Sequence, residues 1–269
     1  MATRSNTCKF RAKHLKTDKE NLTTFSLNKT LKYLELSNNL CTFAHSLNTI
    51  IYIMAKKILF INQEITPYVP ETAMSLLGRD VPQKMQESGF EIRTFMPKWG
   101  NINERRGQLH EVIRLSGMNL IIDDTDHPLI IKVASIPTSR LQVYFIDNED
   151  YFLRRPLMTT DENGEEYADN GERAIFFARG VLETVKKLRW IPDVIVCQGW
   201  MGAVIPFYIK TAYHEEPSFA NTKVVTSIFA EQMKNGLDDN FKKCVEFREA
   251  TSELLASYND KFDFRELGK

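Results

Sequence analysis

The stretch KKILFINQEITPYVPETAMSLLGRDVPQKMQESGFEIRTFMPKWG, residues 56–100, decides the fold. It begins with Lys57–Asn62, an apolar run typical of a strand buried on both faces of a parallel sheet. Two prolines keep the following loop out of regular structure, and the helical pattern after it ends at Gly89. Glu91–Met96 is a second strand, which completes a β-α-β unit. Because such sheets bind ligands at the carboxyl ends of their strands, any functional site is predicted at the first loop, residues 64–72.

The rest of the chain continues to alternate strand and helix patterns. Residues 109–146 hold short apolar runs parted by turn residues, which predicts hairpin-like strands in the main sheet or at its edge. Asn170–Arg189 repeats apolar residues at helical spacing, and Pro192–Cys197 and Lys223–Phe229 are further strands. This order predicts an α/β fold with a Rossmann-like, mainly parallel sheet flanked by helices.

Composition divides the chain into three segments. Residues 1–53 are basic and polar and lack glycine and proline, and Met54 directly before a strand resembles a natural start. We therefore expect this extension to lie outside the fold. Residues 54–230 hold the α/β pattern and form the predicted Rossmann-like domain, whereas residues 231–269 are charged and are expected to form a helical C-terminal tail.

Charge and cysteine content argue against several classes of protein. The chain has 35 Lys and Arg against 35 Asp and Glu, a balance that disfavours a nucleic-acid partner. Its four cysteines are far apart, as expected for reduced thiols of a cytoplasmic protein rather than for a disulfide frame or a zinc site. The apolar residues 40–54 are too few and too polar for a transmembrane helix, so no membrane partner is expected.

Metal and cofactor sites are not predicted. His110, His127 and His214 are scattered without carboxylates at metal-ligand spacing, and we expect them at the surface. The first loop contains no glycine, so the glycine-rich fingerprint of dinucleotide-binding folds is missing from it.

Six short motifs occur in the order and spacing of one enzyme family. They are Gln63–Val69 (QEITPYV), Glu87–Arg93 (ESGFEIR), Met96–Gly100 (MPKWG), Asp150–Arg154 (DYFLR), Tyr167–Phe177 (YADNGERAIFF) and Trp190–Val196 (WIPDVIV). Together they resemble the N-terminal domain of bacterial glycogen synthases and plant starch synthases. The resemblance implies the N-terminal half of a GT-B fold and glucosyl transfer from ADP-glucose to an α-glucan. That reaction needs a second Rossmann-like domain, which we expect on a separate partner chain.

The same resemblance shows where the chain departs from the family. Where the family has Lys-Thr-Gly-Gly-Leu, this chain has Pro70–Met74 (PETAM). The family's lysine offers a cation to the phosphates of the sugar nucleotide and its glycines let backbone N–H groups approach, whereas Glu71 adds a negative charge. An acidic position of the family becomes Leu76, the histidine beside the transferred sugar aligns with Met201, and Thr-Ile-His-Asn aligns with residues 227–230 (SIFA). No catalytic residue is therefore predicted.

The candidate substrate-binding residues are Glu64, Asn170, Gln198 and Trp200. Glu64 matches the family's Glu and could contact a sugar hydroxyl, although bracing of the loop is the favoured reading. Trp200 could stack on a sugar ring or pack at a strand-to-helix turn. Gln198 and Asn170 could bind a hydroxyl-rich ligand, but Asn170 could equally cap its helix. Arg173, in the first turn of that helix, is expected to form an ion pair.

Two functions remain open at this point. The first is a glycosyltransferase of the glycogen or starch synthase type, inactive alone, with ADP-glucose and an α-glucan as ligands. The second is a non-catalytic binding or regulatory module derived from the same fold. In that case a partner chain or a second copy would cover the face that the missing domain leaves exposed.

Overall fold

The computed structural model describes residues 57–155, 158–227, 229, 233–258 and 262–268, which belong to one compact unit. The predicted extension, residues 1–53, lies outside the described residues. No helix in the described ranges is both long and apolar enough to span a lipid bilayer.

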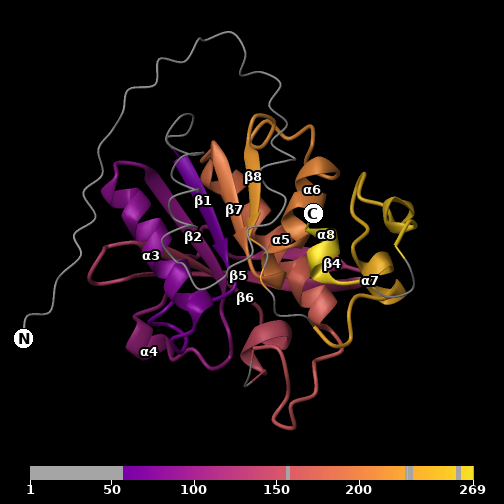
Figure 1. Cartoon of the computed structure of the whole chain (residues 1–269), viewed down its shortest axis with the longest axis horizontal. Coiled ribbons are helices and arrows are strands. Elements are labelled where there is room, and N and C mark those ends of the chain that lie inside the picture. Colours follow the sequence, from indigo (N-terminus) through magenta and orange to yellow (C-terminus); the bar gives the residue numbers. More distant parts are fainter. Residues whose placement is uncertain (1–56, 156–157, 228, 230–232, 259–261, 269) are drawn as a thin grey trace, which may run out of the picture. The chain divides into compact units, whose positions relative to one another are not determined.

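One sheet organises the described chain (Figure 1). Its centre is β1 (Lys57–Asn62), which pairs in parallel with β2 (Glu91–Pro97) on one side and β7 (Val194–Gln198) on the other. β6 (Gln142–Asp147) continues the parallel sheet beside β2, and β8 (Lys223–Ser227) continues it beside β7. Every residue of β7 is buried, and so is every residue of β1 after its first, as expected for strands covered on both faces. The α/β, Rossmann-like prediction is confirmed.

The hairpin-like strands predicted within residues 109–146 form the antiparallel part of the sheet. β5 (Thr125–Ser135) pairs with β6, with the short β3 (His110–Glu111) and with β4 (Met118–Ile122). The order in the sheet is β3-β5-β6-β2-β1-β7-β8, with β4 attached to β5 alone. The hairpin therefore extends the β6 edge and leaves the β7–β8 side parallel.

Helices cover both faces of this sheet (Figure 1). α3 (Ala73–Glu87) connects β1 to β2 on one face, and α5 (Asn170–Leu188) and α6 (Val204–Lys210) lie on the other. This placement follows from right-handed crossovers, because the chain moves outward from β1 through α3 and returns to β7 through α5. A short helix, α4 (Glu104–Gly107), lies among the mainly polar residues 101–108 that follow β2.

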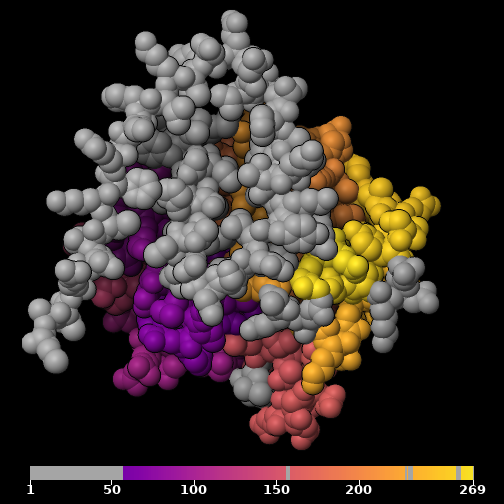
Figure 2. Space-filling view, in the orientation of Figure 1, coloured from indigo at the N-terminus to yellow at the C-terminus, as the bar shows by residue number. Residues whose placement is uncertain are grey.

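The described residues beyond position 233 are helical only in short pieces. They form α7 (Asp239–Cys244), the 3-10 turn η3 (Ser252–Leu255) and α8 (Phe264–Leu267). These pieces pack against the rest of the domain, because most of their apolar side chains are buried and the Tyr208 hydroxyl of α6 donates to the Val245 carbonyl at 2.9 Å. In the space-filling view this yellow segment lies beside the orange surface that precedes it in sequence (Figure 2).

Candidate functional site

The first loop is braced by its own side chains. Glu64 is 6% exposed, and its carboxylate accepts hydrogen bonds from the Thr72 hydroxyl at 2.7 Å and from the Gln63 amide at 3.2 Å. The Thr72 oxygen in turn accepts from the Ser75 N–H at 2.9 Å and closes a capping box at the start of α3. These contacts match the bracing role expected of Glu64, while a contact to a sugar hydroxyl stays a prediction.

Gln198 is the last residue of β7, Trp200 lies two residues beyond it, and both contact residues that flank the first loop. The Gln198 amide donates to the Met74 carbonyl at 3.1 Å, and the Trp200 N–H donates to the Gln63 side-chain oxygen at 3.1 Å. Between them Gly199 has a φ of +78°, and a Cβ there would lie 2.8 Å from the Cβ of Gln63, so only glycine fits. The half-buried Trp200 ring packs 5.1 Å from the ring of Phe264. The carboxyl ends of β1 and β7 are thereby tied together.

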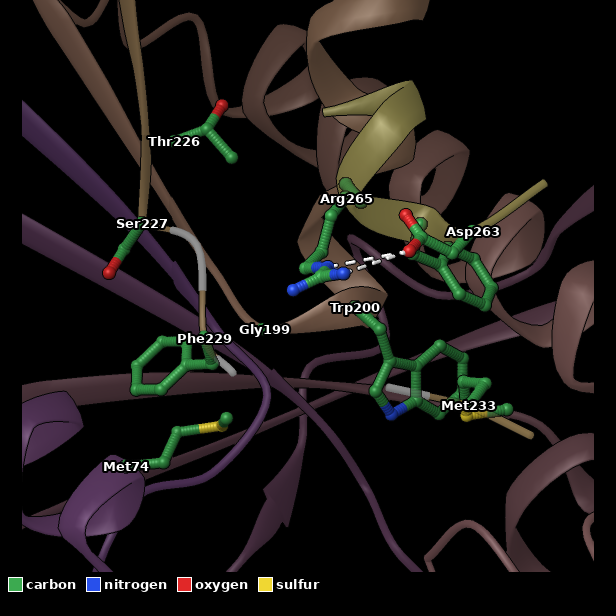
Figure 3. Close-up of a pocket in the computed structure, with 11 residues that line it drawn as sticks. Met74, Gly199, Trp200, Thr226, Ser227, Phe229, Met233, Asp263 and Arg265 are labelled. Carbon is green, nitrogen blue, oxygen red and sulfur yellow. Dashed lines mark hydrogen bonds and ion pairs between the residues drawn. The ribbon is translucent and has the colours of Figure 1, made fainter. Parts of the chain in front are cut away.

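A narrow hollow, which we call the crevice, opens at these strand ends (Figure 3). Its enclosed volume is about 40 Å³, well below the several hundred that a small-molecule site offers. The described residues that line it are Met74, Gly199, Trp200, Ala203, Thr226, Ser227, Phe229, Met233, Asp263, Phe264 and Arg265. The two charged side chains among them, Asp263 and Arg265, pair with each other at 3.3 Å. The crevice therefore offers a mainly apolar wall to a ligand.

Met201, at the position of the family's histidine, does not line the crevice. It is fully buried and belongs to the hydrophobic core. A thioether cannot serve as the hydrogen-bonding or proton-transferring group that an imidazole would supply.

Asn170 does not line the crevice. It is 3% exposed, and its amide donates to the Thr159 carbonyl at 3.0 Å and accepts from Arg173 at 2.6 Å. The expectation that Asn170 caps α5 is wrong, because Asp169 holds the cap position and Asn170 is the first helical residue. Its side chain is instead engaged in fixing Arg173.

The contacts of Arg173 differ from the ion pair that the sequence suggests. Among the described side chains, Arg173 forms no ion pair. Its Nε donates a hydrogen bond to the Tyr151 carbonyl at 2.9 Å, and its guanidinium lies 5.2 Å from the centre of the Trp99 ring. Burial lowers the pKa of Arg173 to about 10, which still leaves it charged at neutral pH. Trp99 also lies 6.4 Å from Trp200, so Arg173 supports the back of the site through an aromatic contact.

A larger hollow, which we call the groove, lies on the other side of the first loop. It has a volume of about 610 Å³, within the range of ligand sites. Its walls are the first loop, the turn that leads into α4 with α4 itself, and the end of β5. The residues that line it are Thr66, Pro67, Tyr68, Val69, Pro70, Glu71, Asn101, Ile102, Asn103, Arg106, Gly107, Gln108, Ser135 and Pro137. Sequence reasoning missed this groove because residues 101–108 show only polarity.

A buried charge cluster holds α4 against the sheet. Lys98 and Lys132 both contact the same carboxylate oxygen of Glu104, at 2.9 and 2.7 Å, and Lys132 also pairs with Asp147 at 2.8 Å. Burial alone would raise the pKa of Glu104, but the hydrogen bonds and charges of the two lysines hold it below its ordinary value. Burial alone would lower the pKa of Lys132, but Asp147 and Glu104 raise it.

His127 is not the surface residue that the sequence suggests. It is 9% exposed, and its Nε2 lies 3.0 Å from the Tyr151 hydroxyl, which donates to Glu172 at 3.2 Å. Since the tyrosine has one proton to give, the Nε2–H tautomer of His127 satisfies both contacts. Burial lowers the pKa of His127 against the opposing charges of Glu172, Asp150 and Asp126. His110 and His214 are exposed as expected.

The remaining polar groups do not assemble a metal centre. Within the described ranges, no cluster of three or more His, Cys, Asp or Glu side chains is placed to hold a metal ion. Cys197 and Cys244 are buried free thiols, whereas Cys8 and Cys41 lie outside the described residues.

Comparison with known proteins gives consistent matches. A family model described as the starch synthase catalytic domain matches residues 57–268. A glycogen synthase of Chlorobium limicola is 40% identical over 172 residues, which are 64% of this chain and 35% of that protein. A glycogen synthase of Chlorobium phaeovibrioides is 36% identical over 204 residues, which are 76% of this chain and 42% of the relative. The chain thus spans less than half the length of these relatives.

A solved structure shares the fold. It is the catalytic domain of starch synthase IV from Arabidopsis thaliana, bound to ADP and acarbose. The TM-score is 0.63 at 15% identity, and the match covers 79% of this chain and 42% of that one. The predicted GT-B architecture is confirmed by this neighbour for the half that the chain represents.

Proposed function

Because the chain belongs to the starch synthase catalytic domain family, we propose that it acts in α-glucan synthesis as the N-terminal half of a glucosyltransferase. The family match over residues 57–268 is the observation that carries this proposal. The glucosyl donor is ADP-glucose and the acceptor is an α-glucan, as the ADP and acarbose of the starch synthase IV structure support. A second Rossmann-like half, supplied by a partner, completes the enzyme in the cytoplasm.

The chain alone is not expected to transfer glucose. Departure of ADP from the donor places charge on the diphosphate, and an enzyme stabilises that charge with cations and aligned N–H groups. At the matching position Pro70 has no N–H, and the exposed Glu71 repels an anion. The crevice adds apolar side chains, and its Arg265 is already paired with Asp263. In this proposal the described residues contribute the part of the enzyme that binds the acceptor glucan. They lack the cations and aligned N–H groups that would stabilise the departing ADP.

The candidate residues have defined parts in this role. Glu64 and Gln198 keep the first loop and the end of β7 in register, through the contacts to Thr72 and Met74. Trp200 lines the crevice and is half-buried, and its ring is the one that we propose stacks on a glucosyl unit. Asn170 acts indirectly, since it positions Arg173.

An assay of ADP release tests the proposal. The full chain is incubated with ADP-glucose and glycogen, alone and with a candidate protein that carries the second Rossmann-like half. We expect no release by the chain alone and glycogen-dependent release by the mixture. Trp200→Ala should lower the rate of the mixture, and Gln86→Ala, an exposed residue of α3, should not. ADP release by the chain alone would contradict the expectation that it is inactive alone. No ADP release by the mixture would contradict the proposal that the chain is half of a glucosyltransferase.

The apolar crevice favours a second candidate function, a non-catalytic binding module. Its half-buried lining residues Trp200, Phe229 and Met233 suit contact with another protein surface better than contact with a diphosphate. In this case a partner chain or a second copy covers the crevice. Sedimentation of the purified chain, with and without maltooligosaccharides, separates the cases, because a strict monomer that binds neither glucan nor protein would reject the module.

A further inference from the structure

We propose that two copies of the chain associate through the outer edge of β8, where their sheets join by antiparallel pairing. The strand order ends at β8, whose inner edge pairs with β7 (Figure 1). Within the described ranges, no strand pairs with the outer edge of β8. The proposal goes beyond glucosyl transfer, because this association needs neither a donor nor a second Rossmann-like domain.

The outer edge of β8 presents a row of backbone hydrogen-bonding groups. The Lys223 N–H donates to the Asp193 carbonyl, beside β7, at 3.0 Å. Because the direction of the backbone groups alternates along a strand, Val225 also faces β7, whereas Val224 and Thr226 face away from it. The N–H and C=O groups of Val224 and Thr226 have no hydrogen-bond partner among the described residues. Such a row is a template for pairing with another strand.

The opposite edge of the sheet is built differently. There β3 is two residues long, and both of them, His110 and Glu111, are polar and exposed. A short edge strand with a charged side chain discourages pairing with another chain. In contrast, β8 has five residues, and its centre is the β-branched run Val224, Val225 and Thr226. Pairing is therefore hindered at the β3 edge and favoured at the β8 edge.

A second copy fits this edge because the outward row is complementary to itself. A two-fold axis at Val225 places Val224 opposite the partner's Thr226 and Thr226 opposite the partner's Val224. In an antiparallel pair, residues opposed in this way exchange both of their N–H···O=C bonds. All the outward backbone groups of both copies would then be paired, and the two-fold contact closes after two copies.

The side chains are compatible with the same register. Lys223, the charged residue of β8, lies opposite the partner's Ser227, so two ammonium groups do not face each other. Val225 lies opposite the partner's Val225, which is an apolar pair. Two five-residue strands make a small interface, and interfaces below about 1,200 Å² are typically weak. We therefore expect a dissociation constant of about 10–100 µM.

Sedimentation velocity of the full chain between about 5 and 500 µM tests the proposal. Two double variants change the same positions equally: Val224→Lys/Thr226→Lys opposes like charges across the two-fold axis, whereas Val224→Glu/Thr226→Lys opposes unlike charges. Val224→Pro removes an outward N–H and leaves the hydrogen bonds to β7 in place. Ile121→Lys, at a 58% exposed residue of β4, is the control for an added lysine on a strand. Urea unfolding verifies that each variant folds.

We expect the wild type to form dimers as its concentration rises. Val224→Lys/Thr226→Lys and Val224→Pro should each weaken the association at least about tenfold. Val224→Glu/Thr226→Lys should dimerise at least as well as the wild type, because each glutamate meets a lysine of the second copy. Ile121→Lys should dimerise like the wild type.

Four outcomes would overturn the proposal. They are a wild type that stays monomeric throughout, equal association of the two double variants, an equal loss of association in Ile121→Lys, and species larger than a dimer. Amide exchange followed by NMR identifies what covers the edge. The Val224 and Thr226 amides should exchange fast in dilute protein and slowly in concentrated protein, and slow exchange in the dilute monomer would also overturn the proposal. ADP release with a second half requires no dimer, so the transferase proposal and this one fail separately.

Discussion

Replacing Glu104 by glutamine tests whether the buried charge cluster fixes α4. The substitution keeps the size of the side chain but removes the negative charge that Lys98 and Lys132 share at 2.9 and 2.7 Å. The loss is largest for Lys98, because its side chain is 2% exposed and water cannot take the place of the carboxylate. Lys132 keeps Asp147 as a partner at 2.8 Å. The change therefore leaves one buried ammonium without a counterion.

The size of the expected loss in unfolding free energy follows from how deeply the charged groups are buried. Removing one partner of a fully buried pair costs about 3–5 kcal/mol of unfolding free energy. The Glu104 side chain is 37% exposed, so screening by solvent reduces this to about 2 kcal/mol. With a urea dependence of about 2 kcal/mol per M, the midpoint of unfolding should fall by about 1 M. Glu162→Gln, at an exposed carboxylate, should leave the midpoint unchanged.

The pH dependence of the difference in urea midpoint between the wild type and Glu104→Gln provides an independent check. The pKa of Glu104 is lowered in the folded state, so its stabilisation is present above the unfolded value of about 4.3 and is lost as the pH falls through the folded value. The pKa of Lys132 is raised, so its contribution is present below about 10.4 and is lost at higher pH. The midpoints of the wild type and Glu104→Gln should therefore converge as the pH falls below the unfolded value of about 4.3. Equal midpoints for Glu104→Gln and Glu162→Gln near neutral pH would refute the reasoning.

Three further substitutions test other parts of the structure. Phe264→Ala should lower the unfolding free energy by about 3 kcal/mol in urea, because a 4% exposed ring is lost at the crevice, and an unchanged midpoint would show that α8 is not anchored there. Arg173→Lys should cost about 2 kcal/mol by losing charged hydrogen bonds, whereas Arg105→Lys at an exposed position should cost nothing measurable in the same assay. His127 has a lowered pKa when folded, so the unfolded chain binds more protons below about 6.5 and stability should fall as the pH drops from about 7 to 5. His127→Gln should flatten that fall in urea midpoints, and an equal effect of His214→Gln would contradict the assignment.

The parallel sheet could be predicted because its strands are continuous apolar runs. Lys57–Asn62 and Pro192–Cys197 have few polar residues, and full burial requires just that pattern. Sheet topology predicts a ligand site at the first loop, and that position stays a prediction. The part played by Glu64 depends on Thr72 eight residues later, and only the folded loop shows the hydrogen bond between them.

Other features depend on contacts between distant segments. α4 is held by Lys98 and Lys132, which come from either side of it in the chain. The sequence of residues 101–108 by itself therefore does not predict that this segment is fixed against the sheet. His127 had a signal that was missed, since alternation along β5 places it on the same face as Leu129 and Ile131. The capping expectation for Asn170 failed because Arg173, one turn later, binds its side chain.

The bond between Thr72 and Glu64 limits how this chain could regain the family's sequence. Grafting Lys-Thr-Gly-Gly onto residues 70–73 would place glycine at Thr72 and remove the oxygen that caps α3. Glycine in place of the capping threonine costs roughly a few tenths of a kcal/mol, and glycine at Ala73 adds a further cost at the first helical position. Glu64 would also lose its 2.7 Å partner while a lysine is introduced nearby. Reversion would therefore have to proceed through a less stable intermediate, unless a compensating substitution elsewhere in α3 came first.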